Sequence, residues 1–252
     1  MAWRIPQRIL SCHTRDVADT NKTVKKKILN SPFALIAHLL WNIRAGLFAK
    51  KFFGQTAEDA ILQLLLKEKK GFYLDIGAGN PIKGSNTYVF YKRGWKGIAI
   101  DPVESNRILF KAIRPRDQFI RKIVSSTSKS LNFWEFAPSE YSTIDPDMAN
   151  TVISRELGIL KSHRQVESIR IADLQIAITP DHPSLLSIDV EGADLDALMS
   201  NNWESFLPRV IAVEEFDYNY GTETRIGEFL GGLGYQRFAW TSLTSIFVHE
   251  SF

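Results

Sequence analysis

The chain has 252 residues, of which 44% are hydrophobic and 23% charged, so it can bury one sizeable core and has the composition of a soluble globular protein. Its single cysteine, Cys12, excludes an internal disulfide and is typical of a reducing compartment, so we expect a cytoplasmic protein. The net charge of +3 is unevenly spread: residues 1–54 carry ten Lys and Arg residues against two acids, and the rest of the chain is net acidic. Because phosphate binding needs clustered Lys and Arg, we expect no nucleic-acid partner for the acidic part.

The basic segment predicts an N-terminal extension, residues 1–53, which we expect to be partly helical. Its most apolar stretch, residues 33–43, is too short for a transmembrane helix, which needs about 20 residues. We expect an amphipathic helix there that docks on the main domain. Peripheral membrane contact through residues 22–54 and a partner interface are the alternatives. The sequence specifies no oligomeric state.

The main domain, residues 54–252, starts with a predicted helix over residues 56–70, with a start signal at Thr56 and a stop at Gly71. Short apolar runs then alternate with helical stretches. The predicted strands are 72–76, 97–101, 118–124, 185–190, 209–215, 235–240 and 244–249. The predicted helices lie near 85–93, 103–113, 193–200 and 222–231.

This alternation predicts an α/β fold with a mostly parallel, seven-stranded, Rossmann-like sheet. The last two strands are joined by only a few residues, so we expect an antiparallel hairpin. Residues 126–180 break the alternation with one strand-like run and a polar stretch. We interpret them as an insertion above the sheet and as a candidate acceptor-binding region.

Acidic residues stand at the ends of four predicted strands: Asp75, Asp101, Asp189, and the pair Glu214 and Glu215. In an open parallel sheet, ligands bind outside the carboxyl ends of the strands. Each acid alone could instead cap the next helix, but four at one edge favour a shared ligand site. A site lined by carboxylates suits a ligand that bears positive charge.

The turn after the first strand, Gly77 to Gly79, is typical of nucleotide-binding folds, and Asp101 lies where an acid binds ribose hydroxyls. A dinucleotide site would need a small residue at position 82, which is Ile82, and Pro81 lacks the backbone N–H that a pyrophosphate would use. An acid that binds ribose without a phosphate cradle points to S-adenosylmethionine, whose sulfonium is positively charged.

The runs "LDIGAGNP", "SNTYVFYKRGWKGIAIDP" and "LLSIDVEGADLDAL" resemble FkbM-type S-adenosylmethionine-dependent methyltransferases, and "GQTAEDAIL" resembles the segment that precedes their first strand. The resemblance spans roughly residues 54–217. It implies a class I methyltransferase fold, and methylation of a hydroxyl oxygen, often in polysaccharide biosynthesis or secondary metabolism. It assigns cofactor contacts to Gln55, Asp75, Gly77, Ala78, Gly79, Asn80, Asp101, Pro102, Ser125 and Asp189.

The candidate catalytic residues are Asp189 and Glu191, beside the reactive methyl group, with Glu214 as a third candidate. Asp189 and Glu191 alternate along a predicted extended segment, so their side chains can share one face and orient or deprotonate a hydroxyl. A capping role for Glu191 and a base role for His163, in the insertion, are the alternatives. No spacing of His, Cys and Asp announces a metal site, and the acids of "STIDPDMAN" are explained equally by a turn with capping residues.

The sequence therefore predicts an O-methyltransferase with a glycan or small-molecule acceptor. The alternative is a catalytically degenerate cofactor-binding protein that scaffolds an assembly complex. Nicotinamide-dependent oxidoreduction is disfavoured by the turn after Gly79.

Overall fold

The computed structural model describes residues 51–127, 129–215 and 224–252. The chain divides into two compact units, Met1–Lys51 and Phe52–Phe252, and the account that follows concerns the second. The predicted extension, its apolar helix and the membrane contact of residues 22–54 lie outside the described residues, apart from the last few positions. No helix in the described ranges combines the length and the apolar character needed to cross a bilayer.

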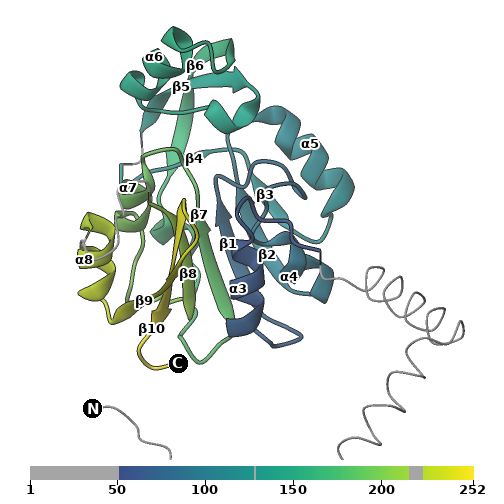
Figure 1. Cartoon of the computed structure of the whole chain (residues 1–252), viewed down its shortest axis with the longest axis vertical. Helices are drawn as coiled ribbons and strands as arrows, with labels where there is room; N and C mark the ends of the chain where they lie inside the picture. The colour runs from purple at the N-terminus through teal and green to yellow at the C-terminus, as the bar shows by residue number, and fades with distance from the viewer. Residues whose placement is uncertain (1–50, 128, 216–223) are drawn as a thin grey trace, which may run out of the picture. The chain divides into compact units, whose positions relative to one another are not determined.

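A seven-stranded sheet in the order β3-β2-β1-β7-β8-β10-β9 forms the centre of the second unit (Figure 1). Its strands are β1 Phe72–Ile76, β2 Lys96–Ile100, β3 Gln118–Ile120, β7 Ser184–Ile188, β8 Val210–Glu214, β9 Tyr235–Trp240 and β10 Thr244–His249. Every pair is parallel except those of β10, which runs antiparallel to both β8 and β9. This topology confirms the predicted fold class, including the final hairpin.

Helices cover both faces of this sheet, so its central strands are buried along almost their whole length and mostly apolar. These helices are α3 Glu58–Leu65, α4 Tyr88–Arg93, α5 Glu104–Ile113, α7 Asp194–Met199 and α8 Arg225–Gly231. Successive strand residues point to opposite faces. Leu185 accordingly joins the core cluster that contains Leu62 of α3, whereas Leu186 joins the one that contains Leu198 of α7.

Helix α3 is shorter than the predicted helix over residues 56–70. It begins after Ala57, whose backbone is left-handed, and ends at Leu65, before the lysines that were expected to close it. Side chains of a neighbouring element take the carbonyl groups that a longer helix would need. Arg93 donates to the Leu66 carbonyl, and the indole N–H of Trp95 donates to that of Glu68 over 3.0 Å. Tertiary contacts therefore outweigh the local helix propensity.

The predicted strand 118–124 is two strands in different sheets. β3 belongs to the large sheet, and β4 Ile123–Val124 belongs to a second sheet of order β4-β6-β5, with β5 Ser130–Ala137 and β6 Ile159–Ile169. Around them lie η1 Ser139–Tyr141, α6 Pro146–Ser154 and η2 Ile171–Leu174. Figure 1 shows β5, β6 and α6 together beyond one end of the large sheet, as expected for an insertion. The strand β6 was not recognised in the sequence because polar side chains occupy most of its central positions and only two of its residues are buried.

Candidate functional site

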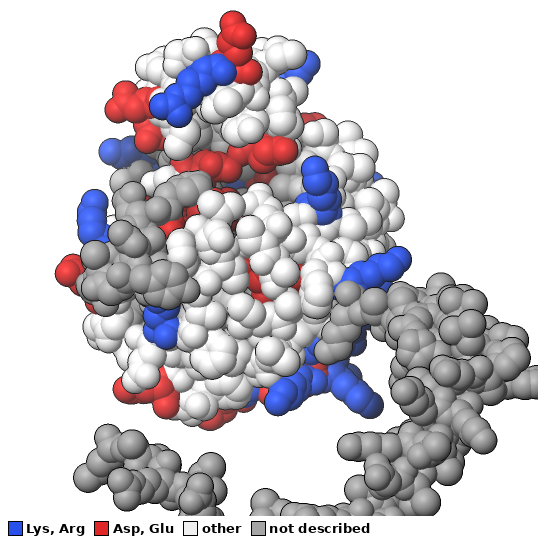
Figure 2. Space-filling model, viewed as in Figure 1, with Lys and Arg blue, Asp and Glu red and all other residues white. Residues whose placement is uncertain are grey.

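A cavity of about 930 Å³ opens at the carboxyl ends of β1, β2 and β7, and the insertion supplies its other wall. Figure 2 shows Asp and Glu side chains gathered below the insertion. Nine of the sequence-predicted residues line the cavity: Gln55, Gly77, Ala78, Gly79, Asn80, Asp101, Pro102, Asp189 and Glu191. The cavity therefore unites segments that are more than a hundred residues apart in the chain.

The glycine turn after β1 is fixed by its neighbours on both sides. The amides of Gly77 and Ala78 both donate to the carbonyl of Ile100, at 2.9 and 3.2 Å. Gly77 has a φ of 71°, and a Cβ atom there would lie 1.7 Å from the carbonyl oxygen of Asp189. The sequence interpretation assigned this glycine to ligand approach, but the close passage of the segment after β7 already requires it. At Gly79 the nearest atom to a Cβ would be 3.8 Å away, so this position is open.

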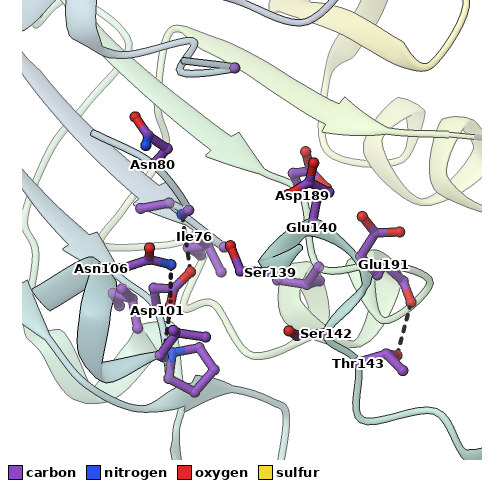
Figure 3. A pocket seen from close by; sticks show the side chains of 18 of the residues that line it. Ile76, Asn80, Asp101, Asn106, Ser139, Glu140, Ser142, Thr143, Asp189 and Glu191 are labelled. Carbon is purple, nitrogen blue, oxygen red and sulfur yellow. Dashed lines mark hydrogen bonds between the residues drawn. The ribbon is translucent and has the colours of Figure 1, made fainter. Parts of the chain in front are cut away.

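Asp101, which follows β2, holds the turn and the start of α5 together. One carboxylate oxygen accepts from the amide of Gly79 at 3.0 Å, and the other accepts from the amide of Val103 at 2.8 Å and the side-chain amide of Asn106 at 3.1 Å (Figure 3). Burial raises the pKa of Asp101, and the three donors counteract this by stabilising the charged form. Since an ionised carboxylate offers about four acceptor positions, one remains for a ligand hydroxyl.

The loop after Gly79 is closed on itself. The Asn80 side-chain oxygen accepts from the amides of Ile82 and Lys83, at 2.9 and 3.0 Å. Pro81 has no amide hydrogen. The backbone donors that a pyrophosphate would need are therefore absent or already engaged, in agreement with the sequence-based exclusion of a dinucleotide.

Two predicted cofactor residues lie outside the cavity. Asp75 is buried, accepts a hydrogen bond from the Thr87 hydroxyl, and lies 3.9 Å from the guanidinium of Arg114, so it ties β1 to the elements beside it. Asp75 is an interior residue of β1 and not its last. Its side chain therefore faces Thr87 and Arg114 and not the cavity. Ser125 bonds to the Thr127 hydroxyl at 3.2 Å, and the preceding residues, 122–124, line the cavity instead. These two predictions are corrected.

Asp189, Glu191 and Glu214 converge at the ends of β7 and β8, and we call these three residues the acid triad. Carboxylate oxygens of all three lie within 4.8 Å of one another. Glu214, the third catalytic candidate, is buried behind the two that line the cavity. The sequence predicted the pairing of Asp189 with Glu191, but for the wrong reason. β7 ends at Ile188, and it is a turn that brings the two side chains together.

The turn after β7 holds Glu191 in a left-handed conformation, with a φ of 53°. Asp194 accepts from the amides of Val190 and Gly192, both at 3.2 Å, and so closes the turn, while α7 begins after Ala193 without a side-chain cap, so Glu191 does not cap it. The hydroxyl of Thr143, from the insertion, donates to the Glu191 carbonyl at 3.4 Å (Figure 3). A non-glycine residue in this conformation costs free energy, which the surrounding hydrogen bonds offset.

Burial raises the pKa of every member of the acid triad, because the charged form loses its hydration. Repulsion from the neighbouring carboxylates adds to this effect. The pKa of Glu191 rises to about 8, and that of Glu214, the most deeply buried, is also raised. The described residues place no Lys or Arg in ion-pair distance of any of the three. Among the described residues, the triad therefore has no basic counter-charge, and its carboxyl groups hold protons more tightly than ordinary acids do.

The insertion contributes residues that the sequence did not single out. Ser139, Glu140, Ser142 and Thr143 line the cavity, and their only signal was a polar stretch between a strand and a helix. Among the aromatic residues of the insertion, Phe133 lines the cavity.

The alternative candidates in the insertion lie away from the cavity. His163 stacks on Trp134 with ring centroids 4.4 Å apart and does not line the cavity, so a role as base is not supported. In the acid-rich stretch, Asp145 caps α6 by accepting from the amide of Asp147 at 2.8 Å.

The comparisons with known proteins place the chain in a family. Residues 75–236, more than half of the chain, match the model of the Methyltransferase FkbM domain. No curated protein matches the chain. This family match confirms the family predicted from the motifs, together with its methyl donor, S-adenosylmethionine.

Two solved structures show distant likeness. One is the Burkholderia thailandensis 1,6-didemethyltoxoflavin-N1-methyltransferase with bound 1,6-didemethyltoxoflavin and S-adenosylhomocysteine, at 13% identity, with 95% of this chain and 91% of that chain covered and a TM-score of 0.38. The other is a TehB-like SAM-dependent methyltransferase from Corynebacterium glutamicum ATCC 13032 Kitasato, at 11% identity, 93% and 100% coverage and a TM-score of 0.38. Neither likeness is close enough to carry a conclusion. On the family match, the chain belongs to the FkbM methyltransferase family.

Proposed function

We propose that this protein transfers a methyl group from S-adenosylmethionine to a hydroxyl oxygen of a sugar, a glycan or another small metabolite. The observation that carries the proposal is that Asp101 and two members of the acid triad, Asp189 and Glu191, line one and the same cavity. At one end of the cavity, the Asp101 carboxylate can accept hydrogen bonds from ribose hydroxyls. At the other end, carboxylates lie beside the space left for the molecule that is methylated.

The cavity suits the methyl donor. Its volume of about 930 Å³ lies within the usual range of ligand pockets and leaves room for a nucleoside and part of an acceptor. The free acceptor position of Asp101 would take a ribose hydroxyl, and Gly79 leaves the space above the turn open. When bound, S-adenosylmethionine would supply a methyl group attached to a positively charged sulfur. An oxygen nucleophile would attack the methyl carbon in line with the carbon–sulfur bond.

The protein must align the acceptor hydroxyl and remove its proton, because a neutral alcohol is a weak nucleophile. Asp189 or Glu191 would accept that proton as the oxygen forms its bond to the methyl carbon, while the breaking bond leaves its electron pair on sulfur. Glu191, with a pKa of about 8, holds a proton weakly enough to exchange it near neutral pH. Its fixed turn supports a positioned base.

The residues of the acceptor side favour a neutral, hydroxylated molecule. The insertion lines this part of the cavity with the hydroxyl groups of Ser139, Ser142 and Thr143 and with the ring of Phe133. Hydroxyl side chains bond to sugar hydroxyls in either direction, and an aromatic ring packs on a sugar face. Nucleic acid is a poor fit, because acids outnumber the two lysines in the lining.

The test is incubation of the full-length protein with methyl-labelled S-adenosylmethionine and a panel of sugar nucleotides, oligosaccharides and hydroxylated metabolites. We expect one acceptor to gain the mass of one methylene at a hydroxyl, and Glu191→Gln to reduce turnover with little effect on S-adenosylhomocysteine affinity. Asp147→Asn, an exposed acid outside the cavity, is the matched control. Binding of the cofactor without any methylated product would favour the scaffold alternative, and a product methylated on nitrogen would contradict O-methylation.

A further inference from the structure

The acid triad is built by two adjacent strands. β7 and β8 are parallel, and their last paired residues are Ile188 and Val213, so Asp189 and Glu214 follow side by side. The turn at Glu191 brings the third carboxylate back over them. Figure 3 shows the side chains of Asp189 and Glu191 directed to the same side of the cavity. Two neighbouring strands and a strained turn thus bring three like charges together.

The environment of Glu214 shows that no basic group among the described residues pairs with this cluster. The residue is 6% exposed, its Oε2 atom is buried without any hydrogen-bond partner among the described residues, and the side chain that does bond to it is another carboxyl group, that of Asp189. The next residue, Glu215, is equally buried but forms an ion pair with Arg237 and accepts from the Thr224 hydroxyl. A buried carboxylate without donors or a counter-ion is costly, and most such groups in proteins are paired. Of these two consecutive acids, Glu215 is therefore paired with a basic residue, whereas Glu214 lies beside two further carboxyl groups.

We propose that Asp189, Glu191 and Glu214 bind one hard divalent cation, such as Mg²⁺ or Mn²⁺, beside the methyl-transfer site. Around Mg²⁺, adjacent ligand oxygens are about 3 Å apart and opposite ones about 4 Å, so carboxylate oxygens that lie within 4.8 Å of one another can bind one ion after closing by about 1–2 Å. The ligand set is all oxygen. Imidazole and thiolate, which select zinc and copper, are absent from the cluster, whereas carboxylates suit Mg²⁺ and Mn²⁺.

The cation would have open coordination positions on the cavity side, because Asp189 and Glu191 line the cavity and Glu214 lies behind them. These positions suit the hydroxyl oxygens of the acceptor, and a sugar with two neighbouring hydroxyls could occupy two of them. This part of the inference rests on the proposed function. Each carboxylate has two oxygens, so one can bind the cation while the other remains for the acceptor's proton.

The test is titration of the chelator-treated, full-length protein with Mn²⁺, with free Mn²⁺ followed by electron paramagnetic resonance and no methyl donor present. We expect one Mn²⁺ per chain, displaceable by Mg²⁺. Glu214→Gln should weaken Mn²⁺ binding by at least the roughly tenfold typical of a residue that supports a metal site. Asp147→Asn, in the acidic stretch of the insertion, should leave the Mn²⁺ affinity unchanged. Thermal unfolding establishes that both variants are folded, and Glu191→Gln, at the half-buried rim, provides a second probe of the same site.

Two outcomes of the titration would overturn the inference: no Mn²⁺ binding at millimolar concentration, or binding that neither triad substitution weakens. S-adenosylhomocysteine affinity and methyl transfer in the presence of a chelator are measured on the same samples. Full activity without a divalent cation would refute the metal site and leave the proposed function standing. A triad-dependent Mn²⁺ site in a protein that methylates no acceptor would support the metal site and count against the proposed function.

Discussion

Replacing Asp101 with asparagine should weaken cofactor binding much more than it weakens the fold. In the structure, the carboxylate accepts hydrogen bonds from Gly79, Val103 and Asn106 and has one acceptor position left at the cavity. Asparagine has the same size and keeps one acceptor oxygen, which can serve Val103 and Asn106. It places an amide N–H₂ against the N–H of Gly79 and removes the negative charge.

The expected loss follows from the bond that the ligand would lose. A hydrogen bond to a charged group contributes about 1.5–3 kcal/mol, which corresponds to an affinity about 10- to 150-fold lower. We expect this change in the dissociation constant of S-adenosylhomocysteine by isothermal titration calorimetry. The free energy of unfolding should fall by only about 1 kcal/mol, because the loss of the charged hydrogen bond from Gly79 is partly offset by the removal of a buried charge.

The matched control is Glu104→Gln, in the first turn of α5. Its carboxylate pairs with Arg107 and Arg121 on the surface and does not line the cavity. Its affinity for S-adenosylhomocysteine should equal that of the unmodified protein. If Asp101→Asn binds as tightly as this control, Asp101 has no part in cofactor binding and the site is wrongly placed.

Three further predictions concern the structure around the cavity. Arg114→Leu should lower the free energy of unfolding by about 3–5 kcal/mol in urea titrations, because it leaves the carboxylate of Asp117, now 2.7 Å from the guanidinium, without its buried partner. Gly77→Ala should lower the melting temperature sharply and abolish S-adenosylhomocysteine binding, because the new Cβ would lie 1.7 Å from the Asp189 carbonyl oxygen. Without divalent cations, the melting temperature should fall as pH rises from about 4 to about 8. The folded triad, with Glu191 near a pKa of about 8, keeps protons that the unfolded chain releases from pH 4 upward.

Each of these predictions has a control within the same region. Arg121→Leu removes an exposed pair and should cost less than about 1 kcal/mol. Gly192→Ala adds a methyl group where no atom lies within 4 Å, so it should cost only the strain of its positive φ. Glu191→Gln should flatten the pH dependence of the melting temperature. Equal losses of stability in a variant and its control would contradict the assigned contacts. A pH dependence of the melting temperature that Glu191→Gln leaves unchanged would contradict them as well.

The fold could be predicted from the sequence because its signals are local. Apolar runs such as the fully buried β7 and β8 alternate with helical stretches, and that rhythm specifies a parallel sheet. The predictions of secondary structure failed where contacts between residues distant in sequence determine the structure. α3 ends early because Arg93 and Trp95 take the carbonyls that follow it, and β6 is too polar to be recognised as a strand before it pairs with β5.

The candidate site was predicted from the ends of strands, and this reasoning succeeded where the side chain follows its strand. Asp101 and Asp189 both do so and line the cavity. Relative to the end of its strand, Asp75 stands two residues earlier than these, inside β1, and its side chain lies near Arg114 instead. The sequence named Asp189, Glu191 and Glu214 as candidates, but the approach of Glu191 to Glu214 depends on a left-handed residue that no local pattern predicted, so only the structure shows the three carboxyl groups together.

The most direct test of this account is parallel calorimetric titration of the folded, full-length protein with S-adenosylhomocysteine and with NAD. We predict one S-adenosylhomocysteine bound per chain and no binding of NAD, since Pro81 has no amide hydrogen and the amides of Ile82 and Lys83 are already bonded to Asn80. Tight binding of NAD, or no heat with S-adenosylhomocysteine at millimolar concentration, would contradict the assignment of the cavity to the methyl donor.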